Sequence, residues 1–213
     1  MQATRIIAVR HGETAWNVDT RIQGQLDVPL NDNGRRQAQR LARALAASEQ
    51  ISAVYSSDLS RAWDTAQSIA AAVGLQTITE LGLRERGFGS FQGKTFTELE
   101  TQWPDETARW RTRDPVWAPP EGETLVAVRE RVERATHALA QRHIGSQIVL
   151  VAHGGVLDMM YRCAAGLDVR APRTWALGNA SINRLLWTPQ GLTLVGWADT
   201  AHLDDKWQDE ITT

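Results

Sequence analysis

Two unbroken apolar runs, at 6–9 and 148–152, are the clearest feature of the hydrophobic pattern along the chain. Such runs, ended by turn residues, are typical of parallel strands that are buried on both faces. They predict strands over 6–9 and 147–152, and shorter strands are predicted at 51–55 and 76–80. Near the end, two segments flank Pro189-Gln190-Gly191 and predict a β-hairpin, so the sheet is expected to be mixed at one side.

Between the strands, apolar residues recur at helical spacing. One helix is expected after the turn residues 31–34. A second is expected to take Asp58 as its N-cap and to run to about Val73, where Gly74 ends it. An apolar stripe over 125–139 predicts a long amphipathic helix, and a last helix is expected at about 156–165. The alternation of predicted strands and helices along the chain predicts an α/β fold.

Residues 95–122 form the least regular part of the chain and predict a lid-like insertion. Two short helices are expected there, and they are followed by Pro115, Pro119 and Pro120. The insertion also carries Trp103, Trp110 and Trp117. We expect at least one tryptophan to fill a small core under the insertion and another, Trp110 or Trp117, to contact a substrate, because aromatic side chains line most small-molecule pockets.

Length, charge and composition limit the classes of protein to which this chain can belong. A length of 213 residues suits a single domain over 1–213, and a net charge of −2 with a pI of about 6.2 argues against nucleic-acid or anionic-membrane partners. No apolar run is long enough to cross a bilayer, and no signal peptide is expected. The single cysteine, Cys163, cannot form an internal disulfide, which favours the cytoplasm. Cys163 is expected to be a buried structural thiol.

Both apolar runs end in His-Gly, as Arg10-His11-Gly12 and as His153-Gly154-Gly155. Ligands bind at the carboxyl ends of strands in open α/β sheets. A single histidine is usually a capping or core residue. Two histidines at equivalent strand ends, one of them preceded by arginine, indicate a functional site instead.

These residues resemble the signature of the histidine phosphatase superfamily, also called the phosphoglycerate mutase-like family. The resemblance covers nearly the whole chain. Besides the two His-Gly stretches it includes Gln23-Gly24-Gln25-Leu26-Asp27-Val28-Pro29-Leu30, Ser56-Ser57-Asp58-Leu59-Ser60-Arg61-Ala62, and Leu83-Arg84-Glu85 followed by Phe88-Gly89. The chain departs from the family at Phe91-Gln92-Gly93, where Trp-Glu-Gly is frequent.

The resemblance implies a three-layer sandwich with a mostly parallel, mixed sheet flanked by helices. It also implies roles for single residues. His11, Glu85 and His153 would be catalytic, with Glu85 as the proton donor. Phosphate would be bound by Arg10, Arg61, Asn17 and Gly154. Gln23 and Gly24 are weaker candidates for substrate binding.

Three of these positions have an alternative interpretation. Arg61 in a surface ion pair with Asp58 or Asp64 is the less favoured interpretation. Glu85 lies between two arginines and would suit a surface ion-pair cluster. Asn17 would suit a solvated loop.

A phosphomonoester needs charge neutralisation, an in-line nucleophile and a proton for the leaving alkoxide. The chain has no P-loop and no metal-binding motif, so we expect no metal and no cofactor. Arg10 and Arg61 would neutralise the phosphate through their planar donor forks. His11 would attack in its neutral form, held by a carbonyl at the Gly12 turn, and His153 would act protonated.

Four functions are compatible with these residues. A phosphomonoesterase acting through phosphohistidine on a small phosphorylated metabolite is preferred, because an aromatic insertion suits a pocket that admits water. A phosphoglycerate mutase is the alternative within the same family. A catalytically silent phospho-ligand-binding domain and a metallohydrolase using both histidines are less favoured. The organic part of the substrate and the oligomeric state stay open.

Overall fold

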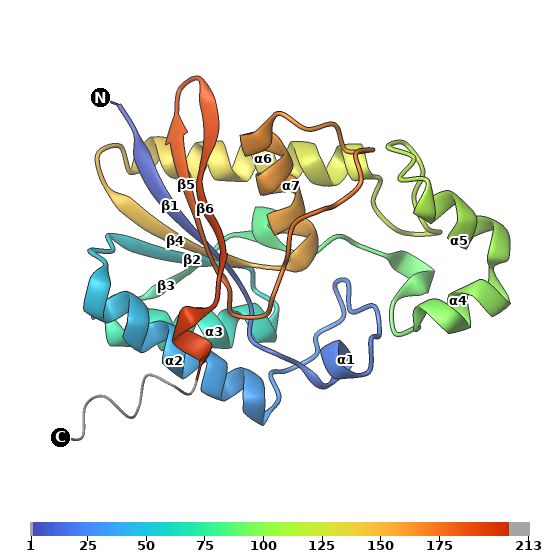
Figure 1. The fold of residues 1–213 in the computed structure, drawn as a ribbon, viewed down its shortest axis with the longest axis horizontal. Helices are drawn as coiled ribbons and strands as arrows, with labels where there is room; N and C mark the ends of the chain where they lie inside the picture. The colour runs from blue at the N-terminus through green and yellow to red at the C-terminus, as the bar shows by residue number, and fades with distance from the viewer. Residues whose placement is uncertain (1, 205–213) are drawn as a thin grey trace.

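The computed structural model describes residues 2–204, so Met1 and the last nine positions of the predicted domain lie outside the described part. Its core is a six-stranded sheet (Figure 1) with the order β3-β2-β4-β1-β5-β6. The strands are β1 (Thr4–Arg10), β2 (Ala53–Ser56), β3 (Thr77–Thr79), β4 (Gln147–Ala152), β5 (Ile182–Thr188) and β6 (Gly191–Asp199). All the predicted strands are present, each within a few residues of its expected bounds.

The sheet is parallel on one side and antiparallel on the other. The pairs β1–β4, β2–β4 and β2–β3 are parallel, whereas β5 runs antiparallel to both β1 and β6. This confirms the mixed sheet that the hairpin signal predicted. Since β1 and β4 are neighbours in register, their carboxyl ends lie side by side at one edge of the sheet.

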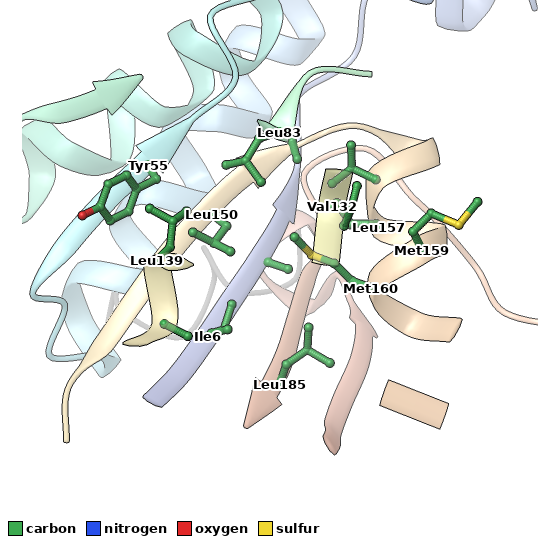
Figure 2. Close-up of a cluster of buried hydrophobic side chains, with 14 of the residues drawn as sticks. Ile6, Tyr55, Leu83, Val132, Leu139, Leu150, Leu157, Met159, Met160 and Leu185 are labelled. Atoms are coloured by element: carbon green, nitrogen blue, oxygen red, sulfur yellow. The ribbon is translucent and has the colours of Figure 1, made fainter. Parts of the chain in front are cut away.

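Helices cover both faces of the sheet and make three layers (Figure 1). Helices α2 (Asp32–Ser48) and α3 (Ser60–Ala72) pack on one face, where Ile7 and Val9 of β1 point. Helices α6 (Leu125–Arg142) and α7 (Gly154–Ala165) pack on the other face, against Ile6 and Ala8. Figure 2 shows part of this second cluster of side chains. Side chains alternate along a strand, so the unbroken apolar run of β1 supplies both cores.

The predicted cap of α3 is wrong. Helix α3 begins at Ser60 after Leu59, which makes no side-chain capping bond. The Asp58 carboxylate instead accepts two hydrogen bonds from the Arg84 guanidinium, and this interaction lowers the pKa of Asp58. Asp58 therefore ties the start of α3 to the segment that carries Glu85.

The segment 92–124, which includes the lid-like insertion predicted over 95–122, has a small core of its own. It contains α4 (Phe96–Gln102) and α5 (Pro104–Arg111), and Figure 1 shows both helices set apart from the sheet. Phe91, Leu99 and Trp117 are buried together, with Trp103 and Trp110 packed against them. The insertion is tied to the loop after β1 by Arg21, whose Nη1 lies 3.0 Å from Glu98 Oε2. This loop contains a short helix, α1 (Ala15–Val18), that the sequence pattern did not predict.

No helix within residues 2–204 combines the length and apolar character needed to cross a membrane. Cys163 is half-buried rather than fully buried, and its Sγ lies 3.0 Å from Glu133 Oε1. Burial and the Glu133 carboxylate raise the pKa of this thiol to about 12. A thiol with so high a pKa is a poor nucleophile, in line with the structural role expected for it.

Candidate active site

The register of β1 and β4 brings the two predicted histidines together. Arg10 at the end of β1 is paired with Ala152 at the end of β4, and the amide of the next residue, His11, donates to the Ala152 carbonyl over 3.0 Å. The rings of His11 and His153 consequently lie 5.2 Å apart between centroids, at 56°. Both histidines are buried.

The orientation of the His11 ring is set by its own turn. Its Nδ1 lies 2.7 Å from the Gly12 carbonyl, which can only accept, so Nδ1 carries the hydrogen and Nε2 has the lone pair. The Gly12 amide in turn donates to Thr65 Oγ1 on α3 over 3.0 Å. Burial, followed by the Arg10 and Arg61 charges, holds the pKa of His11 well below its usual value. The ring is therefore neutral at neutral pH and able to attack.

Asn179, in the loop before β5, braces the same turn. Its Nδ2 lies 3.0 Å from the His11 carbonyl and 3.2 Å from Asn17 Oδ1. Asn17 Oδ1 also accepts from the amide and the hydroxyl of Thr14. Because three donors converge on Oδ1, the amide group of Asn17 is fixed with Nδ2 as its remaining donor. Asn17 is thus the N3 residue of a capping box rather than part of an unstructured loop.

Arg61 is fully buried, so the expected alternative of a surface ion pair with Asp58 or Asp64 is wrong. Its Nη1 and Nη2 donate to the carbonyls of Leu26 and Gly24 over 2.8 and 2.6 Å. The loop after β1 therefore aims the guanidinium. Its Nε has no partner in the described part of the chain, and burial lowers the pKa of Arg61 to about 10.

Arg10 is held in a similar way. Its Nη1 donates to the Leu177 carbonyl, and its buried Nε has no partner among residues 2–204. Both ring nitrogens of His153 are also buried without a partner there. Buried polar groups are almost always hydrogen-bonded. Unpaired donors on two arginines and unpaired ring nitrogens on a histidine, all beside His11, therefore form a site suited to an anion.

Glu85 reaches this site from the segment after β3. Its carboxylate accepts from the Gly155 amide at the N-terminus of α7, at 3.1 Å to each oxygen, and from the Arg86 amide at 2.7 Å. A Cβ on Gly155 would lie 2.3 Å from Glu85 Oε1, so only glycine permits this approach. A Cβ on Gly154 would lie 3.8 Å from Arg10 Nε and 3.9 Å from Glu85 Oε2, which places Gly154 between the acid and the arginine.

The expected protonated state of His153 does not match its surroundings in the protein. Burial, with Arg61, His11 and Arg10 as further causes, holds the pKa of His153 well below its usual value. These groups favour the neutral ring. Protonation of His153 would need an additional negative charge next to it.

The weaker candidates, Gln23 and Gly24, lie in the loop after β1 whose carbonyls accept from Arg61. Gly24 has a positive φ of 53°, and a Cβ there would lie 2.1 Å from Gln92 Oε1, so glycine is needed for Gln92 to pack. Gln92 Oε1 accepts from the Gln25 amide, which organises the loop where the chain departs from the family pattern. Gln23 is buried, and its Oε1 has no partner among the described residues.

Trp110 and Trp117 belong to the aromatic cluster of the insertion. Trp110 stacks on Phe88 and Phe91 at 5.2 and 5.5 Å between ring centroids, and Trp117 is buried 6.1 Å from Phe91. The satellite core expected for at least one tryptophan is therefore present. Contact of Trp110 or Trp117 with a substrate stays a prediction.

Sequence reasoning missed three residues that build the site: Thr65, Gly155 and Asn179. Gly155 could have been noticed in the sequence, because two successive glycines are unfavourable at the start of a helix. Thr65 and Asn179 could not have been found in this way, because each bonds to the turn at His11 and Gly12, which is distant in the sequence. Within residues 2–204, no three metal-ligating side chains come together.

Comparison with known proteins is consistent with this geometry. The family model described as histidine phosphatase superfamily (branch 1) matches residues 6–200. The chain is 41% identical to phosphoglycerate mutase-like protein 4 of Arabidopsis thaliana, over 94% of this chain and 87% of that protein. It is 36% identical to the metal-independent phosphoserine phosphatase of the same plant, over 95% and 84%.

A solved structure has the same fold. The mycobacterial glucosyl-3-phosphoglycerate phosphatase in complex with VO3 superposes with a TM-score of 0.82 at 33% identity, covering 92% of this chain and 99% of that one.

Proposed function

Because the chain belongs to the histidine phosphatase superfamily, we propose that it is a metal-independent phosphomonoesterase that acts through a phosphohistidine on a small phosphorylated metabolite. One observation carries the proposal. His11 is neutral and its tautomer leaves Nε2 free to attack, and the neighbouring Arg10, Arg61 and His153 carry buried nitrogens that have no partner within residues 2–204. This arrangement provides donors for phosphate oxygens and a nucleophile in one place.

In the first step His11 Nε2 attacks phosphorus in line with the ester oxygen. The N–P bond forms, the P–O bond to the alcohol breaks, and Glu85 gives its proton to the departing oxygen. Arg10 and Arg61 would offer the phosphoryl oxygens their Nε donors, which have no partner among residues 2–204. In water-excluded surroundings such fixed donors stabilise developing charge strongly.

In the second step water attacks the phosphohistidine. Glu85, now ionised, takes a proton from this water, the N–P bond breaks, and inorganic phosphate leaves. The same carboxylate serves both steps because the Gly155 and Arg86 amides hold it in one place. Phosphate oxygens beside His153 would add the negative charge that its protonated form requires.

The phosphoenzyme is the decisive test. Rapid quench with a phosphorus-labelled ester, followed by peptide mapping, should find an acid-labile label on His11. The His11→Ala variant should show no label and almost no turnover. Label on a serine, or turnover unchanged in His11→Ala, contradicts the mechanism. Activity lost in EDTA and restored by Mg²⁺ or Zn²⁺ would favour a metallohydrolase instead.

The mutase alternative rests on the relative named phosphoglycerate mutase-like protein 4. Phosphorus NMR of the protein with 3-phosphoglycerate, with and without 2,3-bisphosphoglycerate, separates the two activities. We expect inorganic phosphate as the main product. Rapid formation of 2-phosphoglycerate with little inorganic phosphate would establish the mutase.

A further inference from the structure

Ala180 has an unusual backbone conformation next to the candidate nucleophile. It lies in the loop before β5, is fully buried and has a φ of 54°. Residues other than glycine seldom adopt this left-handed conformation, and it persists only where the surrounding structure holds it. The contacts of Ala180 therefore indicate what the conformation is for.

In this conformation the amide of Ala180 reaches the end of β1. Its N–H is shared between the carbonyls of Arg10 and His11, at 3.0 and 3.2 Å. The side chain of the preceding residue, Asn179, donates to the carbonyls of His11 and Gly12. The backbone that carries the His11 ring is thus held by the turn at 179–180.

The carbonyl of Ala180 is held in turn by His202, in the short helix η3 (Ala201–Leu203). His202 Nε2 lies 3.1 Å from this oxygen, which can only accept, so Nε2 carries the hydrogen. The other ring nitrogen, Nδ1, is buried and has no partner among residues 2–204. Burial lowers the pKa of His202, which favours the neutral ring. The polar contact of this ring in the described part of the chain is therefore the bond to Ala180.

The helix η3 is itself fixed to the rest of the fold. It packs on α2 (Figure 1), where Arg40 Nη1 donates to the Leu203 carbonyl over 2.7 Å. At its start the Ala201 amide donates to Asp199 Oδ1 over 3.1 Å. The His202 ring thus reaches the turn at 179–180 from an anchored helix.

We propose that His202 is a positioning residue for the nucleophile His11 and that it acts by holding the left-handed turn at Ala180. This inference rests on the proposed phosphatase function. Without the bond to His202, Ala180 can relax towards a common backbone conformation, and its amide then turns away from the carbonyls of Arg10 and His11. A nucleophile that is slightly misplaced reacts slowly even when its substrate still binds.

Three replacements of His202 test this role, with p-nitrophenyl phosphate as the substrate. The amide nitrogen of glutamine can reach the position of Nε2, whereas that of asparagine reaches only the position of Nδ1. We expect kcat to fall about tenfold in His202→Ala and His202→Asn, with KM within about twofold of the wild type. In His202→Gln kcat should stay within about threefold of the wild type. Equal kcat values in folded His202→Gln and His202→Asn overturn the inference.

His143→Ala is the matched control. His143 is also a half-buried histidine whose pKa is lowered by burial, but it lies after α6 and its Nε2 is 2.8 Å from the Tyr55 hydroxyl of β2. Its replacement should leave kcat at the value of the wild type. A loss of kcat as large as that in His202→Ala would show that removal of any such histidine slows the protein, and it would overturn the inference.

Hydrogen exchange measured by NMR reports on the turn without any activity. The Ala180 amide should exchange about tenfold faster in His202→Ala and His202→Asn than in the wild type and His202→Gln. Unchanged exchange overturns the inference. If no variant folds, nitrogen NMR of the wild type decides, because a His202 ring with its hydrogen on Nδ1 contradicts the bond to Ala180. No hydrolysis by the wild type overturns the proposed function instead, and the exchange rates still test the turn.

Discussion

Asn179 holds the backbone of His11 from a position 168 residues further along the chain. Replacing it with alanine removes the donor to the His11 carbonyl and to Asn17 Oδ1 but leaves every charge in the site unchanged. We expect kcat for p-nitrophenyl phosphate to fall about tenfold to a hundredfold, because a small misplacement of a reacting group is costly, with a much smaller change in KM. Steady-state kinetics at neutral pH measures this.

Asn179→Asp is the informative companion, since it keeps the shape of the side chain and loses the donor. Its carboxylate would also repel the His11 carbonyl and an anionic substrate, so its loss should be at least as large as that of Asn179→Ala. A kcat within a factor of about two of the wild type, in a protein with an unchanged melting temperature, would mean that Asn179 serves packing and not positioning.

Glu85→Gln tests whether Glu85 is the proton donor to the leaving group, because glutamine cannot give up a proton in this way. A good leaving group needs little protonation, so we expect the variant to slow alkyl phosphates by roughly 10²–10⁴ and aryl phosphates such as p-nitrophenyl phosphate far less. The glutamine can still accept from the Gly155 and Arg86 amides that hold the carboxylate. Equal losses on both kinds of ester would place the acid on another residue, with Glu13 the next candidate.

At the scale of elements, the insertion should be able to open without unfolding the sheet. Its core rests on Phe91, which is fully buried against Trp103, Trp110 and Trp117. Phe91→Ala should reduce the local stability of residues 92–124 by about 3–5 kcal/mol. Limited digestion with trypsin should then cut faster after Arg109, Arg111 and Arg113, while the rest of the chain stays intact.

Phe96→Ala provides the control for this prediction, because Phe96 lies in the same insertion but is 40% exposed. Its digestion rate should stay close to that of the wild type. If Phe91→Ala instead lowered the melting temperature of the whole protein with no preferred cleavage, the insertion would be a cooperative part of the main core.

Elements were predictable from the sequence to the extent that local patterns determine them. The run in β4 and the stripe in α6 were placed correctly, because burial on one or both faces requires apolar residues at fixed spacing. The N-cap of α3 was predicted wrongly, because Asp58 accepts hydrogen bonds from the Arg84 guanidinium instead. Arg84 comes close to Asp58 only in the folded chain. The burial of Arg61 could not be predicted either, because its partners are backbone carbonyls of a loop that has no sequence periodicity.

At the scale of the whole molecule, the buried histidines link stability to acidity. Burial lowers the pKa values of His11 and His153, so each binds a proton more readily in the unfolded chain. Their contribution to the free energy of unfolding is fully present above the pKa of about 6.5 that histidine has in the unfolded chain, and it is lost as the pH falls below that value. We expect the free energy of unfolding, measured with urea, to decrease between about pH 7 and 5.

The variant His11→Asn/His153→Asn should flatten this dependence. A residual slope should remain, because burial also lowers the pKa values of His143 and His202. An identical slope in the wild type and the double variant would show that the two site histidines do not set the acid limit of the fold.

The bond between His11 Nδ1 and the Gly12 carbonyl has a stereochemical consequence. With one nitrogen engaged, phosphorus can be attacked by Nε2 alone, and each in-line transfer inverts its configuration. Transfer to the histidine and then to a water-derived nucleophile makes two inversions. A phosphoryl group made chiral with oxygen isotopes should therefore be passed with net retention to an alcohol that replaces water as acceptor, and a racemic or inverted product would mean that no such covalent intermediate forms.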